Sequence, residues 1–184
     1  MDPHELLKRL TETPGPSGME GRVAEVVEAS WGPLVDDVKR DRVGSLIAAK
    51  YGEGGEPRPK LLLAAHLDEI GLMVKQILPG PGETGRSGFL RTTRVGGVDV
   101  RHLYGQMVVV HGSAGGGQEI MGVVGSLPAW MLPEAKRDKA YDLEDLVVDV
   151  GLPYEEVSSL IHVGDFISFR QPMDPLRTGA GWIP

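Results

Sequence analysis

The sequence predicts an α/β segment that is followed by a small all-β module. Residues 2–10 and 17–31 place apolar side chains at helical spacing, and residues 60–66 form a continuous apolar run, typical of a strand covered on both faces. Between residues 72 and 170 the pattern changes to short β-like runs separated by glycine-containing turns. Evenly spaced short strands with turn signals between them predict a small closed barrel or a sandwich.

The two helices expected in the α/β segment have recognisable first residues. Asp2 is a capping residue, and Pro3 follows it at the first helical position. We expect this helix to bury a leucine stripe made of Leu6, Leu7 and Leu10. Ser17 and Glu20 lie three residues apart and predict a capping box for the second helix, which we expect to reach Trp31.

Strands are expected in both parts of the chain. Residues 38–49 predict a strand pair or a bulged hairpin ahead of the apolar run. In the β module, six runs predict strands: 72–77, 88–95, 106–111, 119–124, 146–150 and 165–170. Residues 153–160 predict a helix within this module, because a proline precedes a helical pattern there.

Composition narrows the possible functions. A chain of 184 residues can form one domain with a sizeable core or two small ones. The net charge of −7 argues against a nucleic-acid partner and against an anionic membrane surface. The absence of cysteine excludes disulfides, thiol nucleophiles and thiolate-bound metals, so a metal would have to use histidine and carboxylate ligands. Without a signal-peptide pattern or a membrane-length apolar stretch, we expect a soluble, cytoplasmic protein.

The residues best placed for chemistry stand at the end of the apolar run. His66 and Asp68 are two residues apart, so their side chains would point to the same side of a strand. A metal-bound histidine uses one ring nitrogen for the ion and donates from the other to an acceptor that fixes the ring. The spacing alone also suits a histidine that is satisfied by hydrogen bonds beside a turn aspartate, and both interpretations stay open at this point.

The remaining histidines are weaker candidates, because none has metal-ligand spacing to a neighbour. We expect His4 to be solvated, His102 and His111 to be at the surface or half-buried, and His162 to make local hydrogen bonds. The sequence has no HExxH motif, no Gly-x-Ser-x-Gly elbow and no phosphate-binding loop. Ser17 and Ser45 have no paired base in view, so they suit capping and turn roles.

Six short blocks, read in order along the chain, carry a resemblance to a known family: Pro16–Glu20, Asp41–Leu46, Ala65–Gly71, Gly122–Ser126, Asp145–Gly151 and Val163–Asp165. Together they resemble the N-terminal part of the M42 family of metallo-aminopeptidases, whose members have been described as glutamyl aminopeptidases or as endoglucanases. The blocks cover nearly the whole chain. The His-x-Asp-Glu-Ile-Gly block is the most specific of them, and it favours His66 as a metal-ligand position.

The resemblance implies an organisation into three parts. Residues 1–71 would be the N-terminal part of a zinc-peptidase-like α/β domain, and residues 72–170 an inserted PDZ-like β-barrel used in oligomerisation. Residues 171–184 would be a truncated return to the peptidase domain. The implied partners are therefore peptide substrates and further copies of the same chain, with no nucleic acid and no membrane.

The resemblance also implies a chemistry, the metal-dependent release of N-terminal residues from peptides. In such enzymes two divalent ions, zinc or cobalt, lower the pKa of a bridging water. His66 would be a metal ligand, and Asp68 would be the catalytic carboxylate that orients its imidazole. The family's other ligands follow the β module, and residues 171–184 do not match them. Because a zinc site needs at least three protein ligands, we expect this chain to be inactive by itself.

Two further expectations follow. The alternative to an enzyme is a non-catalytic assembly or binding module built on the β-barrel. In either case residues 60–66 would lack the later strands and helices that cover such a strand, so their apolar side chains would stay exposed and favour self-association.

Overall fold

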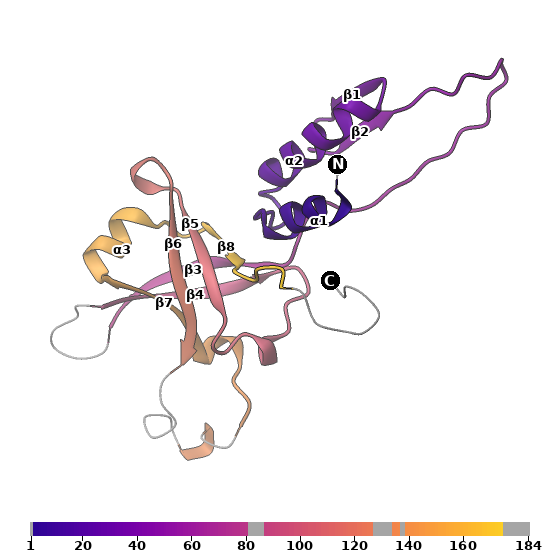
Figure 1. Ribbon diagram of the computed structural model, residues 1–184. Helices are drawn as coiled ribbons and strands as arrows, with labels where there is room; N and C mark the ends of the chain where they lie inside the picture. The colour runs from indigo at the N-terminus through magenta and orange to yellow at the C-terminus, as the bar shows by residue number, and fades with distance from the viewer. Residues whose placement is uncertain (1, 81–86, 127–133, 137–138, 175–184) are drawn as a thin grey trace. The chain divides into compact units, whose positions relative to one another are not determined.

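The structure is a computed structural model that describes residues 2–80, 87–126, 134–136 and 139–174 (Figure 1). The chain divides into two compact units. Met1–Asp68 and Pro172–Pro184 make up the first, called here the N-terminal unit, and Glu69–Gln171 make up the second, the barrel unit. Residues 175–184, which hold most of the segment expected to return to a peptidase domain, lie outside the described residues.

The first helix of the N-terminal unit, α1 (Pro3–Glu12), begins as the sequence predicts. The side chain of Asp2 accepts a hydrogen bond from the backbone N–H of His4 at 3.0 Å, and Pro3 occupies the first helical position. The predicted leucine stripe is only partly covered. Leu7 is 37% exposed, and no residue of α1 is buried. A helical stripe needs a second apolar surface, and in this unit α1 packs mainly against one other helix.

The second helix, α2 (Gly21–Trp31), forms where it was expected but is not capped by Ser17. Its N-cap is Glu20, whose side chain makes no capping hydrogen bond to the helix and accepts instead from the backbone N–H of Gly18 at 2.7 Å. The hydroxyl of Ser17 donates to the carboxylate of Asp68. The predicted capping box is therefore wrong, because the helix begins only at Gly21, with Glu20 rather than Ser17 at its N-cap position. α2 buries Val23, Ala24, Val27 and Ser30.

The predicted strand pair is confirmed as a hairpin that follows α2 and the short 3₁₀ helix η1 (Gly32–Leu34). Strands β1 (Asp37–Arg40) and β2 (Leu46–Ala49) pair antiparallel. In the turn, Oδ1 of Asp41 accepts from the backbone N–H groups of Val43 and Ser45, both at 2.9 Å. Gly44 takes a φ of 96°, which only glycine adopts without strain.

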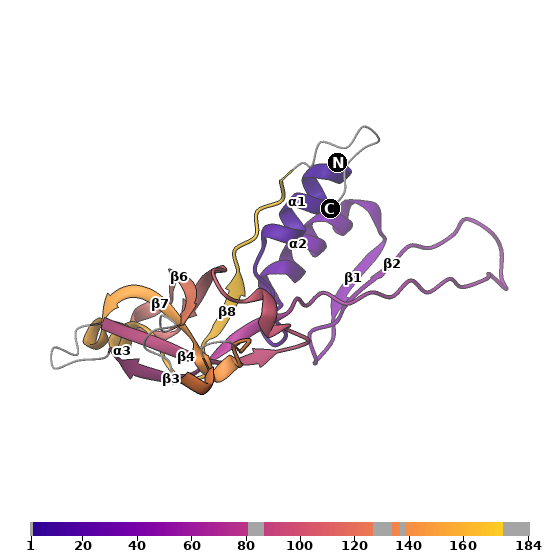
Figure 2. The same ribbon diagram turned by 90° about the horizontal axis from the view of Figure 1, so that it is seen from below.

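The strand predicted for residues 60–66 is absent from the described chain. Residues 50–68 contain no helix or strand and extend away from the β1–β2 hairpin as a long excursion (Figures 1 and 2). Leu61, Leu62 and Leu63 are 86%, 86% and 85% exposed, as the prediction of uncovered apolar surface requires. A buried strand needs paired neighbours and covering layers on both faces, and the described part of this unit offers only a two-stranded sheet.

The barrel predicted for the second half is confirmed. Its six strands close in the order β3-β4-β7-β6-β5-β8, and they pair antiparallel. The strands are β3 (Gly71–Pro79), β4 (Ser87–Val95), β5 (Met107–Gly112), β6 (Gln118–Ser126), β7 (Leu146–Pro153) and β8 (Phe166–Phe169). Closure leaves no unpaired edge for the sheet to expose, so the module satisfies its own backbone.

Alternate residues of these strands fill the barrel. Leu72, Leu90, Val108 and Ile167 are fully buried at 0% exposure. The predicted helix, α3 (Tyr154–Leu160), adds Val157 to the same core. Short 3₁₀ helices connect the strands: η2 (Val100–His102), η3 (Ala114–Gly116), η5 (Glu134–Lys136) and η6 (Leu143–Asp145).

Close backbone approaches make the barrel intolerant of added side-chain atoms at certain glycines. A Cβ atom at Gly88 would lie 2.7 Å from Cγ2 of Val157, so α3 can sit directly on β4. At Gly112 a Cβ atom would overlap the carbonyl oxygen of Leu160. Within the described residues, none of the helices is both long and apolar enough to cross a membrane.

The Val163–Asp165 block has a structural task in the barrel unit. Asp165 is 7% exposed, and its Oδ2 accepts from the backbone N–H of Ser113 at 2.9 Å and of His162 at 2.7 Å. Gly164 supplies the positive φ of 99° that this turn needs. The bond from the backbone N–H of His162 to Asp165 confirms the local hydrogen bonding predicted for this histidine. Its ring makes a long-range contact as well, with Nδ1 3.0 Å from the hydroxyl of Ser113, 49 residues earlier.

Candidate metal-ligand site

His66 and Asp68 lie in contact at the end of the exposed apolar run. Nδ1 of His66 is 2.8 Å from the backbone carbonyl oxygen of Asp68 and 3.1 Å from its Oδ1. Both neighbours are acceptors, so Nδ1 carries the proton and Nε2 keeps the lone pair. The His66 side chain is 85% exposed. The ring is therefore held from one side and presents a ligand nitrogen on the other, although the backbone that carries it is not a strand.

The second oxygen of the Asp68 carboxylate is also engaged. The Ser17 hydroxyl donates to Oδ2, across 51 residues of sequence. This hydroxyl is the main cause that holds the pKa of the Asp68 carboxyl below its ordinary value, and the His66 ring adds to it, while partial desolvation opposes both. A carboxylate held in this way stays ionised and keeps accepting from the imidazole.

Ser17 is the part of this arrangement that sequence reasoning missed. Its pairing with Glu20 suggested a helix cap, and that local reading concealed a partner far along the chain. The Pro-Ser-Gly block is the sequence feature that could have indicated another role for Ser17. A proline and a glycine on either side of a serine define the backbone conformation of a turn, so the serine is not needed as a helix cap. Pro16 is fully buried and Gly18 has a φ of 97°.

Packing against α2 sets the position of Ser17. A Cβ atom at Gly15 would lie 2.8 Å from Cγ1 of Val23, so the chain passes closer to the helix than another residue would permit. The backbone N–H of Met19 donates to the carbonyl oxygen of Pro16 at 2.7 Å and closes the turn. The hydroxyl of Ser17 therefore comes from a packed loop, whereas its partner Asp68 comes from an extended segment.

The pair supplies part of what a divalent metal requires. His66 fits one ligand position for zinc or cobalt, and Asp68 fits the acid that supports a ligating imidazole. Across the described ranges, no group of three or more His, Asp or Glu side chains is arranged to hold a metal ion. The described residues thus supply one imidazole and its support, which is less than a complete site.

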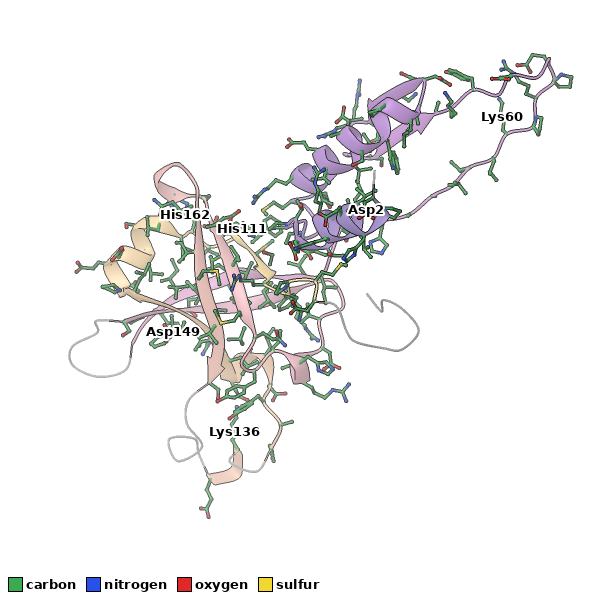
Figure 3. The ribbon with its side chains drawn as sticks, in the orientation of Figure 1. Asp2, Lys60, His111, Lys136, Asp149 and His162 are labelled. Carbon is green, nitrogen blue, oxygen red and sulfur yellow. The ribbon has the colours of Figure 1, made fainter. Side chains whose placement is uncertain are left out.

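The other histidines serve the barrel unit. His111 is half-buried, as predicted, with Nε2 2.9 Å from the hydroxyl of Ser168 and Nδ1 3.8 Å from Oε1 of Glu119. Figure 3 places His111 and His162 on the barrel unit and Lys60 on the exposed excursion that leads to His66. His111 thus links β5 to β6 and β8, and within the residues that the structure describes the barrel histidines provide no further ligand set.

Comparison with known proteins identifies relatives along nearly all of the chain. Residues 44–181 match the family model of the M42 glutamyl aminopeptidases. The lysyl aminopeptidase of Pyrococcus furiosus is 36% identical over 154 residues, which are 83% of this chain and 40% of that protein. The chain spans less than half the length of the curated relatives that it matches across most of its length, and it corresponds to their N-terminal portion.

Solved structures give the same result. A TET aminopeptidase from a marine sediment archaeon of the Thaumarchaeota superposes with a TM-score of 0.80 at 33% identity, covering 95% of this chain and 46% of that one. The TET1 peptidase of Pyrococcus horikoshii, described as assembling into a tetrahedron or a large octahedral shell, has a TM-score of 0.69 at 36% identity and covers 91% and 46%. Both likenesses extend to the α/β arrangement with its closed barrel.

Proposed function

Because the chain belongs to the M42 glutamyl aminopeptidase family, we propose that it is the N-terminal part of a metal-dependent aminopeptidase that releases N-terminal residues from peptides. The observation that carries this proposal is the contact between Asp68 and Nδ1 of His66, which leaves Nε2 as the free lone pair on an exposed ring. Residues 1–71 would belong to the peptidase domain, residues 72–170 to a PDZ-like insertion, and residues 171–184 to a return toward the peptidase domain.

Each residue of the pair has a separate role in the proposal. His66 would bind zinc or cobalt through Nε2. Asp68 would hold the ring at Nδ1 and raise the basicity of the imidazole, and would in this way serve catalysis. When bound, such ions lower the pKa of a water molecule so that it can attack a peptide carbonyl. The residues of this chain contribute the orientation of one ligand to that chemistry.

We also propose that the 184-residue chain does not hydrolyse peptides by itself. Its described residues offer one metal-facing imidazole, whereas zinc sites use at least three protein ligands. Purified chain mixed with amino-acid p-nitroanilides and Co²⁺ should release no p-nitroaniline above the metal blank. A release that depends on metal and stops with a chelator would contradict this proposal.

Isothermal titration calorimetry with Zn²⁺ and Co²⁺ tests the ligand assignment. The wild-type chain should give weak binding that His66→Ala removes and His102→Ala retains. His102 is an exposed histidine of the barrel unit, so its variant controls for metal binding to any surface imidazole. Equal heats for the wild type and His66→Ala would remove the basis of the proposal.

A chimera tests the activity itself. Joining this chain to the part of the Pyrococcus furiosus lysyl aminopeptidase that follows its matched region would supply the remaining ligands. The chimera should release N-terminal residues in the presence of metal, and His66→Ala should abolish that release. An active chimera that is indifferent to His66→Ala would exclude His66 as a ligand.

A second function, self-assembly through the barrel unit, is favoured by one surface. Met107, Met121 and Val123 are 42%, 42% and 36% exposed. Met107 is the register partner of Val123, and Met121 the partner of Val109, so these side chains share the outer face of β5 and β6. An exposed apolar face marks an interaction site, and the Pyrococcus horikoshii relative assembles into closed shells.

Sedimentation velocity tests this second proposal. The wild-type chain should form an oligomer, and Met121→Glu should weaken it. Val163→Glu is the matched control, because Val163 is an apolar side chain of the same unit that is 64% exposed but lies outside β5 and β6. A monomer at all concentrations, or an equal effect of the two variants, would contradict assembly through this face.

A further inference from the structure

We propose that Ser17 is a positioning residue of the metal-ligand site, which acts through Asp68 to fix the ring of His66 with Nε2 facing the metal. This inference rests on the proposed function, because it assigns a role within the same site. Nothing in the His-x-Asp spacing requires a third residue, and Ser17 comes from a loop that precedes α2, 51 residues before Asp68.

The carboxylate of Asp68 is held at both oxygens by groups from different parts of the chain. Ser17 donates to Oδ2, and the protonated Nδ1 of His66 donates to Oδ1 at 3.1 Å. Loss of the first hydrogen bond would free the carboxylate to rotate and would leave one contact to define its plane. The plane of this carboxylate decides where Oδ1 lies, and Oδ1 is one of the two acceptors of Nδ1, beside the backbone carbonyl oxygen of Asp68 at 2.8 Å. Ser17 therefore influences the direction of the imidazole without touching it.

Ser17 and Asp68 lie on backbone of different kinds. Ser17 follows the fully buried Pro16, in a turn packed against Val23 of α2. Asp68 ends the stretch of residues 50–68, which contains no helix or strand, so no backbone ladder of that stretch holds the carboxylate in place. The hydroxyl of Ser17, which lies in a packed loop, therefore fixes the position of the Asp68 carboxylate, which lies on an extended segment.

A purely structural tether is the competing interpretation. In that case Ser17 would hold residues 66–68 near α2, and removing it would lower stability without altering the protonation pattern of the ring. The tautomer of His66 distinguishes the two, because Oδ1 of Asp68 adds to the backbone carbonyl oxygen as an acceptor that favours a proton on Nδ1, and Ser17 acts on Oδ1 alone.

The tautomer can be measured by long-range ¹H–¹⁵N correlation on ¹⁵N-histidine-labelled protein, at one fixed pH above the imidazole pKa. Wild-type His66 should be mainly protonated at Nδ1. Ser17→Ala should shift part of the population toward the Nε2-protonated form, because the backbone carbonyl oxygen of Asp68 still faces Nδ1, and Ser17→Thr should restore the wild-type pattern. Ser30→Ala is the matched control, since the hydroxyl of Ser30 is also held in this unit, where it donates within α2 to the carbonyl oxygen of Val26 at 2.7 Å.

Metal binding gives a second readout. Supporting residues of metal ligands contribute about 10- to 100-fold in affinity, and Ser17 acts one step further out, so Ser17→Ala should weaken Zn²⁺ binding by up to about tenfold. Ser17→Thr should bind like the wild type. Should Ser17→Ala fail to fold by circular dichroism, Ser17→Cys keeps the shape with a weaker donor and should shift the tautomer in the same direction.

The outcomes separate this inference from the proposed function. An unchanged His66 tautomer in folded Ser17→Ala or Ser17→Cys would overturn the positioning role, even if stability fell. The proposed function would survive that result as long as His66→Ala still removed metal binding. If His66→Ala left metal binding intact, the proposed function would fail whatever the tautomer showed.

Discussion

In the barrel unit Leu72, Leu90 and Val108 are fully buried at 0% exposure, whereas in the N-terminal unit Leu61 and Leu62 are both 86% exposed. Strands were predicted at both places, and residues 60–66 were also predicted to keep their apolar side chains exposed in this chain. The barrel closes on itself with antiparallel neighbours that lie within about 100 residues of each other in the chain, so its core is complete. The apolar run of the N-terminal unit requires parallel neighbours and covering helices, which the described chain does not contain.

The two units also differ in how their polar side chains are held in position. The barrel orders its polar groups internally, as the buried Asp165 does by accepting two backbone N–H groups. In the N-terminal unit the residues that could bind metal lie on backbone that has no helix or strand. Their geometry depends on a side-chain contact to a packed loop, through Ser17.

The largest expected difference between the units comes from the same substitution made in each. Leu90→Ala should lower the free energy of unfolding of the barrel by about 2–5 kcal/mol, because it removes a fully buried side chain and leaves a cavity. Leu62→Ala should change stability by less than about 0.5 kcal/mol, since that side chain is already in water. Urea denaturation followed by circular dichroism measures both, and equal losses would show that Leu62 is covered in solution.

A smaller effect is expected from an added methyl group. Gly112→Ala should cost about 1–3 kcal/mol, because the new Cβ would overlap the carbonyl oxygen of Leu160 and the backbone must move. Gly125→Ala is the control, as nothing lies within 4 Å of its added Cβ, and it should leave the urea midpoint nearly unchanged. A neutral Gly112→Ala would mean that the contact between β5 and the end of α3 is looser than the structure shows.

These differences also mark what the sequence could predict. Short β-like runs between glycine-containing turns predicted the six barrel strands closely, and a proline before a helical pattern predicted α3, because every partner needed to form these elements lies within the described chain. The helix start at Asp2 and the hairpin turn at Asp41 are local hydrogen-bonding patterns, and local patterns are readable from sequence. The strand at residues 60–66 was wrong because its partners are not local.

The candidate site was only partly readable for the same reason. The spacing of His66 and Asp68 predicted their contact, and the contact is present even without a strand, since two residues of separation also suit a turn. Ser17 could not be assigned by periodicity or by capping rules. Its partner lies 51 residues away, and only the packing of the loop on α2 brings the hydroxyl to the carboxylate.

Limited proteolysis should sharpen the contrast between the units. Chymotrypsin at low concentration should first cut within residues 50–68, where Tyr51 and Leu61–Leu63 are exposed on backbone without helix or strand. The barrel residues 69–171 should persist as a protected fragment. Mass spectrometry identifies the first cut, and an initial cut inside a barrel strand would contradict the ranking of the two units.

The smallest expected effect is a pH dependence of the β1–β2 hairpin. The backbone N–H of Ser45, and to a lesser extent that of Val43, lowers the pKa of Asp41 from its ordinary value of 3.8. A carboxyl whose pKa is lower in the folded state adds stability above the ordinary value, and that stability is lost as the pH falls through the folded-state pKa. The amide resonances of the hairpin should therefore shift as the pH falls from 5 toward about 2. Asp41→Ala should remove this dependence, and Asp37→Ala, on the exposed face of β1, should keep it. If the amide shifts of the hairpin follow the same pH curve in Asp41→Ala, the hairpin is stabilised by packing against α2 and not by the turn.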